Sequence, residues 1–185
     1  MNRSLSTLRG TILIREAKPT DAVLFRELRL YALQESPIAF TADYQETLSY
    51  PQKYWEGTLT MHEDESTIFF AEHESKLIGQ AGIARGSSPK TRHGAWIWGV
   101  FVRPEWRGLH IAEELIHSCF TWAKARKIIL VKLGVTASNT PALRCYERCG
   151  FQIYGTEPQA VFYDGKFYDE YLMSCPLESD TLSKE

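Results

Sequence analysis

The chain has 185 residues, with 21 Lys and Arg against 23 Asp and Glu, which gives a formal net charge of −2. A hydrophobic fraction of 44% and a charged fraction of 24% are typical of a soluble globular protein. The near-neutral charge argues against a nucleic-acid or anionic-membrane partner. No apolar run approaches the roughly 18 residues of a membrane span. We therefore expect one domain without either partner.

The termini and the cysteines indicate the domain limits and the compartment. Residues 1–10 lack the apolar core of a secretory signal, so we expect a flexible tail there, one domain over 11–175 and a polar tail over 176–185. The four cysteines include no Cys-x-x-Cys pair, and His and Cys do not cluster. Reduced thiols in a cytoplasmic protein are therefore favoured over a disulfide or a metal site.

The first half of the chain alternates between strand and helix signals. Residues 11–17 alternate in polarity and predict a strand, and a helix follows Pro19 and ends at Ser36-Pro37. Residues 38–50 predict a loop or an irregular helix, and a second helix begins near Pro51. Two apolar runs then predict a hairpin, residues 67–73 and 76–85.

The second half predicts a parallel unit followed by a hairpin. A nearly all-apolar strand (95–102), an amphipathic helix (108–126) and an alternating strand (128–136) follow one another and predict a right-handed strand–helix–strand unit. A short helix then ends at Gly150, and Asp164-Gly165 predicts the turn of a final hairpin. The element order is that of a mixed α/β fold of the α+β type.

The connection between strand 95–102 and the next helix is the first candidate site. Residues 100–112 read VFVRPEWRGLHIA. The first turn of a helix leaves backbone N–H groups free, and with the helix dipole these groups attract an anion. Gly108 lets the backbone approach a phosphate closely. No P-loop or Rossmann fingerprint is present, so on its own the segment is better interpreted as an ordinary strand–helix turn.

A second segment resembles a signature of the GNAT superfamily of N-acetyltransferases. That signature is an Asn after a strand, a short helix with Ala-x-x-x-Tyr, and Gly-Phe, and Asn139, Tyr146 and Gly150 occupy its positions here. Residues 107–112 are similar to the acetyl-CoA loop of the same superfamily. The resemblance implies a three-layer fold with a mostly antiparallel sheet of six or seven strands. It also implies a splay between strands 95–102 and 128–136.

The resemblance implies that the splay binds acetyl-CoA as cosubstrate. The Val100 N–H would polarise the thioester carbonyl, as an oxyanion hole does, and Tyr146 would be the catalytic acid that protonates the departing thiolate. No metal is implied. The residues that the resemblance assigns to acetyl-CoA binding are Val100, Phe101, Val102, Arg107, Gly108, Leu109, His110, Ile111, Ala112, Glu113, Asn139 and Tyr146.

Several of these residues have a second interpretation. His110 replaces the more common Gly, and it either donates to a phosphate, more strongly at lower pH, or lies in solvent. Arg107 either adds charge to the phosphate site or lies in solvent. Asn139 binds the pantetheine amide or caps the helix. Tyr146 is alternatively a core residue, and Gly99 marks either a bulge that opens the splay or a close-packed position.

The general base is not evident from the sequence. Many family members have a Glu on the strand equivalent to 95–102, but this strand carries Trp96 and Trp98 and no carboxylate. The other sources considered are a water chain and four side chains elsewhere, Glu46, Glu72, His73 and His93.

The resemblance implies an enzyme, an N-acetyltransferase that passes the acetyl group directly from acetyl-CoA to a primary amine in a ternary complex. The amine belongs to a small molecule or a peptide. Because the base is missing, two other functions stay open, a non-catalytic acyl-CoA sensor and a protein-interaction domain. The resemblance also leaves a homodimer open.

Overall fold

The structure is a computed structural model that describes residues 2–60 and 64–177. Within these residues the strands are β1 (Asn2–Thr7), β2 (Gly10–Glu16), β3 (Ser66–His73), β4 (Lys76–Arg85), β5 (Gly94–Val102), β6 (Leu130–Thr136), β7 (Gln152–Tyr163) and β8 (Lys166–Pro176). The α-helices are α1 (Ala22–Glu35), α2 (Tyr44–Leu48), α3 (Gln52–Leu59), α4 (Ile111–Ala125) and α5 (Thr140–Arg148). Short 3₁₀ turns are η1 (Pro19–Asp21), η2 (Pro37–Ala39) and η3 (Pro104–Trp106).

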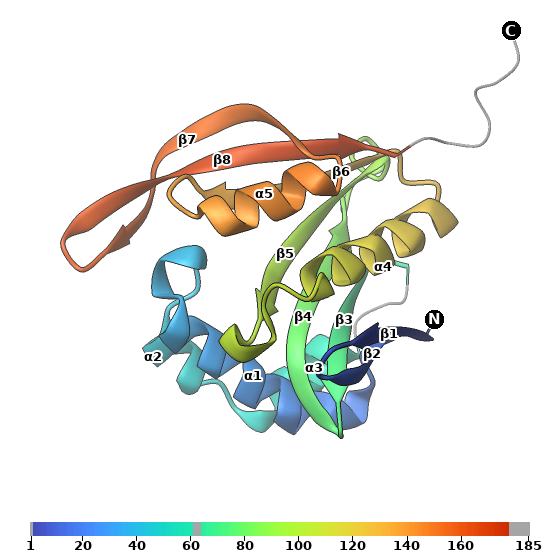
Figure 1. Ribbon diagram of the computed structural model, residues 1–185. Coiled ribbons are helices and arrows are strands. Elements are labelled where there is room, and N and C mark those ends of the chain that lie inside the picture. The colour runs from blue at the N-terminus through green and yellow to red at the C-terminus, as the bar shows by residue number, and fades with distance from the viewer. Residues whose placement is uncertain (1, 61–63, 178–185) are drawn as a thin grey trace, which may run out of the picture.

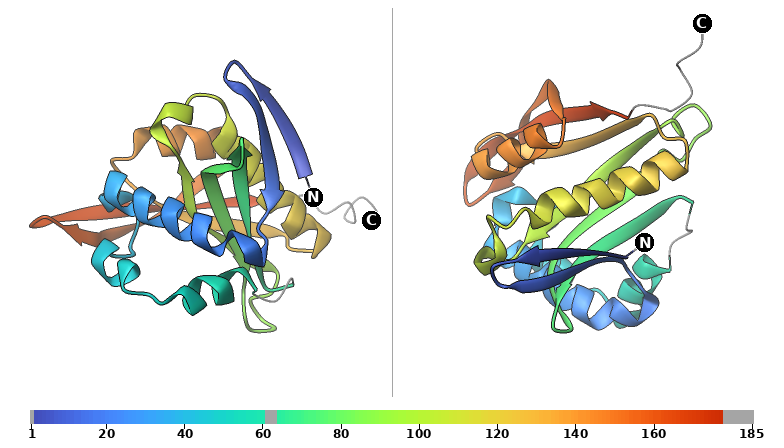
Figure 2. Two further views of the ribbon diagram at one scale, coloured as in Figure 1. Left: turned by 90° about the horizontal axis from the view of Figure 1, so that it is seen from below. Right: turned by 45° about the vertical axis from the view of Figure 1, so that its right-hand side comes forward.

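One sheet in the order β1-β2-β3-β4-β5-β6-β8-β7 lies between two layers of helices (Figures 1 and 2). Helices α4 and α5 cover one face, where Ile111 and Leu115 pack with Val131 in a large buried cluster. Helices α1 to α3 cover the other face, where Phe25 and Trp55 lie in a second cluster. The predicted three-layer fold is therefore confirmed. No helix in the described residues is long and apolar enough to cross a bilayer.

The strands β5 and β6 form the parallel pair of the sheet, and they separate early. They are paired only from Gly94–Leu130 to Trp96–Lys132. The register of β4 and β5 shifts between two pairs, Trp98 with Gly82 and Phe101 with Gln80. Two residues of β5 separate these pairs, but only one residue of β4 does. Gly99 lies in this bulge at φ +64°, a conformation that favours glycine. The predicted splay and the predicted bulge at Gly99 are both present, and a bulge bends the strand in which it lies.

The expectation of a flexible tail over residues 1–10 is wrong for residues 2–7. These residues form β1, which pairs antiparallel with β2 and brings Leu5 opposite Ile12. Leu5 packs against the large core, and the Thr7 hydroxyl donates to the Gly10 carbonyl at 2.8 Å across the turn. The sheet therefore has eight strands rather than six or seven. At the other end β8 reaches Pro176, and residues 178–185 of the expected polar tail lie outside the described residues.

Two other boundaries differ from the sequence prediction. Helix α4 begins at Ile111 instead of residue 108, because Gly108 and His110 have φ values of +78° and +59° and a right-handed helix cannot include them. The predicted extended segments after Gly150 merge into β7, which accommodates two register shifts against β8.

A buried ionic cluster ties the first strand–helix connection to the sheet. The Arg15 guanidinium donates to both oxygens of Asp21 at 2.7 and 2.8 Å, and to Glu72 at 2.6 Å. The side chains of Arg15 and Asp21 are each 8% exposed. Burial by itself would raise the pKa of Asp21, but hydrogen bonds from Arg15 and from the Lys18 N–H outweigh burial, so the pKa lies below its ordinary value.

We predict that Asp21→Asn lowers the free energy of unfolding by about 3 kcal/mol at pH 7, since it removes one partner of a buried ion pair. A carboxyl with a lowered native pKa stabilises the fold above its unfolded pKa of about 3.9, and this contribution is lost as the pH falls through the native value. The difference between wild type and variant should therefore shrink in acid. Urea unfolding at several pH values measures it.

The matched control is Asp164→Asn, at an exposed hairpin turn. It should leave the free energy of unfolding within about 0.5 kcal/mol of wild type. An equal loss in both variants, or a difference that does not change with pH, would contradict the assignment.

Candidate functional site

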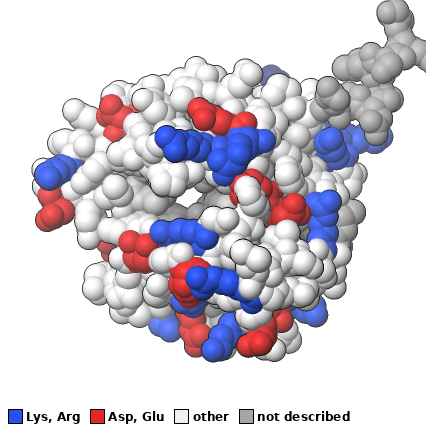
Figure 3. Space-filling view, viewed as in Figure 1, with Lys and Arg blue, Asp and Glu red and all other residues white. Residues whose placement is uncertain are grey.

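A cavity of about 320 Å³ lies where the splay opens. Its walls are the end of β5, the start of α4, the start of α5 and the segment at η2. The space-filling view shows a hollow in this face of the molecule, with charged side chains of both signs on its borders (Figure 3). Three separate chain segments therefore meet at one site, two of which carry the sequence motifs.

The cavity brings together the predicted site residues except Leu109, whose side chain packs against the large core. Those that line it are Val100, Phe101, Val102, Arg107, Gly108, His110, Ile111, Ala112, Glu113, Asn139 and Tyr146. The predicted acetyl-CoA residues do not include the other lining residues, namely Ser36, Ala39, Phe40, Trp106, Pro141, Ala142, Cys145 and Arg148. Ser36 to Phe40 could not be found from a motif, because they reach the site only through the packing of α1 and η2.

One wall of the cavity is an unpaired strand edge. After Trp96 no residue of β5 pairs with β6 in the described parts of the chain. Val100 and Val102 line the cavity on this stretch. Backbone N–H and C=O groups rarely stay without a partner, and an extended ligand chain can supply the missing hydrogen bonds in the manner of an added strand.

A second wall is a concave turn of backbone N–H groups. Within the described residues the N–H groups of residues 108–112 have no hydrogen-bond acceptor. The left-handed conformations of Gly108 and His110 alternate with their neighbours, which is the geometry of an anion-binding nest at the start of α4. An ideal Cβ at Gly108 would have no atom within 4 Å, so there is room against this backbone. The pyrophosphate of acetyl-CoA fits such a cradle in charge and in hydrogen bonding.

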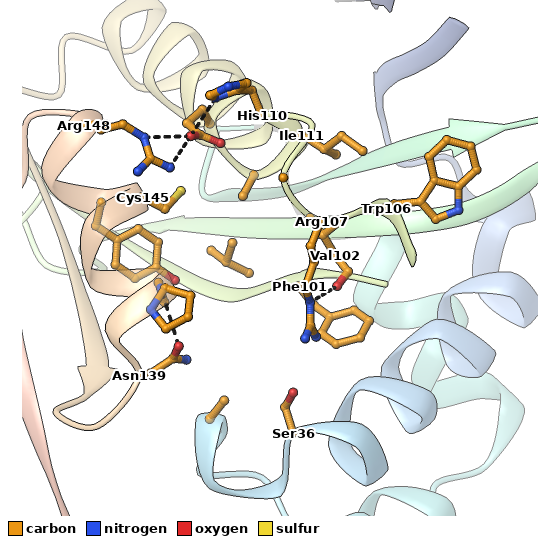
Figure 4. Close-up of a pocket in the computed structure, with 18 of the residues that line it drawn as sticks. Ser36, Phe101, Val102, Trp106, Arg107, His110, Ile111, Asn139, Cys145 and Arg148 are labelled. Atoms are coloured by element: carbon orange, nitrogen blue, oxygen red, sulfur yellow. Dashed lines mark hydrogen bonds and ion pairs between the residues drawn. The ribbon is translucent and has the colours of Figure 1, made fainter. Parts of the chain in front are cut away.

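His110 and Arg148 both approach the carboxylate of Glu113 at the rim (Figure 4). Arg148 donates to Glu113 Oε1 at 2.6 Å, and His110 Nδ1 lies 3.1 Å from the same oxygen. Burial raises the pKa of Glu113, but hydrogen bonds from Arg148 and His110 outweigh it and the pKa is lowered. The His110 side chain is 72% exposed. A contact of its imidazole with a phosphate stays a prediction.

Arg107 connects the loop after β5 with the end of α1. Its Nη2 donates to Glu35 at 2.7 Å and its Nε to the Val102 carbonyl at 3.0 Å (Figure 4). Burial by itself would raise the pKa of Glu35, but hydrogen bonds from Arg107 and Ser36 lower it. Arg107 is thus neither free in solvent nor without a counter-ion, and its side chain holds two walls of the cavity together.

Asn139 and Tyr146 lie on the cavity side of α5. Asn139 Oδ1 accepts from the Ala142 N–H at 3.3 Å, so the capping interpretation holds while its side chain also lines the cavity. Tyr146 is 7% exposed and packs into the large core. Burial, and then Cys145 and Cys149, raise the pKa of the Tyr146 phenol well above its usual range. The phenol therefore stays protonated and can donate a hydrogen bond into the cavity.

None of the four side chains considered as general base lines the cavity. Glu72 binds Arg15, Glu46 accepts from the Tyr50 hydroxyl at 2.9 Å, and His73 packs against Trp106. His93 ends the turn before β5.

Glu170 on β8 is a carboxylate beside the splay that sequence reasoning missed. It pairs with Thr136 at the end of β6, and an ideal Cβ at Gly134 would lie 2.9 Å from its Oε2 and 3.7 Å from Trp96 Cζ2. Burial, and then the opposing Glu157, raise its pKa. The motif search did not include it because its place depends on the pairing of β8 with β6, two strands that are distant in sequence.

The chain matches the model of the acetyltransferase (GNAT) family over residues 29–151. A curated relative, the L-amino acid N-acetyltransferase AaaT of Escherichia coli K12, is 28% identical over 105 residues, which are 55% of this chain and 62% of that protein. The chain spans about half the length of the curated relatives it matches.

Solved structures share the architecture. An acetyltransferase of the GNAT family from Streptococcus pneumoniae has a TM-score of 0.82 at 24% identity, covering 90% of this chain and 99% of that one. The Salmonella typhimurium protein yncA, solved with its cofactor acetyl-CoA, has a TM-score of 0.80 at 16% identity, covering 94% and 98%. These likenesses show the fold, and the family match spans both sequence motifs of the cavity. The chain belongs to the GNAT acetyltransferase family.

Proposed function

We propose that the chain is an enzyme that transfers an acetyl group from acetyl-CoA to a primary amine of a small molecule or peptide, by direct attack in a ternary complex. The observation that carries this proposal is the cavity in which the unpaired edge of β5 meets the unbonded N–H groups of residues 108–112. Membership in the GNAT family and a relative named for transfer to L-amino acids support it.

The binding roles follow from the walls of the cavity. Backbone groups of Val100 and Val102 hold the pantetheine arm, the N–H groups of residues 108–112 hold the pyrophosphate, and the Asn139 amide binds a pantetheine amide. Glu113 does not repel the phosphates strongly, because its charge is balanced by Arg148. When bound, acetyl-CoA supplies an activated acetyl thioester with a good leaving group.

Two groups of the chain stabilise the charge that develops during transfer. The Val100 N–H donates to the acyl oxygen, as in an oxyanion hole. Tyr146 donates to the departing sulfur. Since burial raises the pKa of this phenol further above the thiol reference of about 8.5, we assign to it a stabilising hydrogen bond in preference to complete proton transfer.

We assign the general base to Glu170. A primary amine with a pKa near 10 must lose a proton before it attacks. A carboxylate whose pKa is raised by burial and by Glu157 is a better proton acceptor than an ordinary Glu. Glu170 does not line the cavity itself, but it lies over Gly134 beside Trp96, on the sheet face opposite α4, and an amine that attacks from this face would meet it. A general base at this position favours an acetyltransferase over a non-catalytic acyl-CoA sensor.

Two wider expectations are also proposals. A cytoplasmic location is supported by four cysteines that are free and buried. A homodimer is supported by the hairpin of β7 and β8, which projects from the sheet and exposes Phe162 and Phe167 to 62% and 60% (Figure 1). Cell fractionation and light scattering test them.

We predict that the wild type binds CoA in calorimetry and releases CoA thiol from acetyl-CoA in the presence of amines. Gly108→Ala places a methyl group against the phosphate cradle and should weaken CoA binding about 10-fold or more. Gly165→Ala is the matched control, since Gly165 has a similar φ of +73° and equally open space at a hairpin turn. Equal Kd values in the two variants would exclude the cradle. CoA binding without thiol release for any amine would indicate a sensor, and no CoA binding an interaction domain.

We predict that Tyr146→Phe lowers kcat by about 10- to 100-fold with little change in the KM for acetyl-CoA, since one hydrogen bond to a charged group is lost. Steady-state kinetics from pH 6 to 9 measures both constants. An unchanged kcat at every pH would show that Tyr146 is a core residue only.

We predict that Glu170→Gln lowers kcat/KM at pH 7 by about 100-fold or more, and that the loss shrinks at high pH as free amine accumulates. Glu157→Gln is the control, because removal of its charge lowers the pKa of Glu170. It should move the acid limb of the pH profile to lower pH and retain activity at pH 7. Wild-type kcat/KM in Glu170→Gln would refute the assignment.

A further inference from the structure

Arg29 on α1 holds a positive charge for which residues 2–60 and 64–177 supply no counter-ion. Its Nη1 is fully buried and has no hydrogen-bond partner. The guanidinium makes no ion pair there; its Cζ lies 4.7 Å from the centre of the Phe40 ring, and Tyr54 is near enough to affect its pKa. Glu35 is engaged with Arg107 and Glu46 with Tyr50, while Glu27, two residues before Arg29 on α1, is exposed.

A second nitrogen borders the same space. An ideal Cβ on Gly99 would lie 3.4 Å from Arg29 Nη1 and 3.4 Å from Gln80 Nε2. Gln80 Nε2 donates to the Gly99 carbonyl at 3.0 Å, which fixes the amide with its nitrogen towards Gly99, and the Gln80 oxygen has no partner. Apart from Gly99 and its chain neighbours, no other heavy atom of the described residues lies within 4 Å of that Cβ position.

The absence of a counter-ion is costly in the free protein. Burial lowers the pKa of Arg29 to about 10, so the guanidinium is still charged at neutral pH. The residue as a whole is partly exposed, but its Nη1 is buried, and a buried donor without a partner is costly. Such a group is retained where a ligand completes it, since functional sites are where proteins tolerate this penalty.

Arg29 is also close to the proposed point of acyl transfer. Gly99 directly precedes Val100, whose N–H we assign to the acyl oxygen, and Phe40 lines the cavity. An anion held by Arg29 would therefore lie near an amine that attacks beside Val100. Guanidinium groups match the geometry of carboxylates better than that of any neutral ligand.

We propose that Arg29 binds a carboxylate of the acceptor, and that the acceptor is an amino acid or another amine with a carboxylate close to its amino group. This inference rests on the proposed function. The competing explanation is structural, in which Arg29 only packs over Phe40 as a cation–π contact.

The test compares amines that differ only in the carboxylate. Release of CoA thiol is measured for a panel of L-amino acids and for the carboxamide of each, with wild type, Arg29→Met and Arg29→Lys. Arg26→Met is the matched control, because Arg26 lies three residues earlier on α1 and donates to the Leu48 carbonyl at the surface. We expect wild type and Arg26→Met to prefer at least one L-amino acid over its carboxamide by about 10- to 100-fold in kcat/KM. Arg29→Met should abolish this preference and Arg29→Lys should retain part of it.

Thermal unfolding separates the two explanations independently of activity. A ligand-binding Arg29 predicts that Arg29→Met unfolds at the same or a higher temperature than wild type, because an uncompensated buried charge is removed. A purely structural Arg29 predicts a lower temperature. If Arg29→Met does not fold, the substrate preference of Arg29→Lys decides.

The inference is overturned if wild type treats each acid and its amide alike, or if Arg29→Met keeps the preference. If wild type binds CoA but acetylates no amine of the panel, the proposed function fails for these acceptors. The inference is then tested by calorimetry, in which N-acetyl amino acids are titrated into the complex of the protein with CoA. Binding in wild type that is lost in Arg29→Met upholds the carboxylate site, and absence of binding refutes it.

Discussion

The separation of β5 from β6 after Trp96 is the constraint on which the candidate site depends. Neighbouring parallel strands normally stay paired, since each unpaired backbone group is costly when it is buried. Here an extra residue in β5 and the left-handed conformation of Gly99 bend the strand away. The result is a strand edge that faces a cavity. The proposed cosubstrate and the proposed acceptor site both rest on this one departure from regular pairing.

The charged side chains around the cavity are paired with one another, so the electrostatic field in the cavity comes mainly from the backbone. Glu113 is paired with Arg148 and Arg107 with Glu35, so these side chains largely cancel at the rim. The unbonded N–H groups of residues 108–112 and the dipole of α4 do not cancel. An anion is thus attracted to the turn itself, which explains how His110 can replace glycine there without removal of a hydrogen-bond donor.

The sequence predicted the elements whose signals are local. Gly108 and the Asn139 cap act within a few residues, so their motifs located two of the cavity walls, and the turn at Asp164-Gly165 located the last hairpin. Strand β1 was missed because its serines give a weak pattern, and it is fixed by pairing with β2. Arg29 and Glu170 were missed for a related reason: each reaches the site through contacts between distant segments, which a linear motif does not record.

The unpaired polar atoms at the site share one chemical character. Apart from the Gln80 oxygen and the carbonyl groups on the unpaired edge of β5, the groups identified there are donors: the N–H groups of residues 108–112 and Arg29 Nη1. The buried charges at the first strand–helix connection are in contrast fully paired through Arg15, Asp21 and Glu72. A surface rich in donors is complemented by a ligand rich in acceptors. Phosphates, a thioester carbonyl and a carboxylate are such acceptors, and together they describe an acyl-CoA beside an anionic amine.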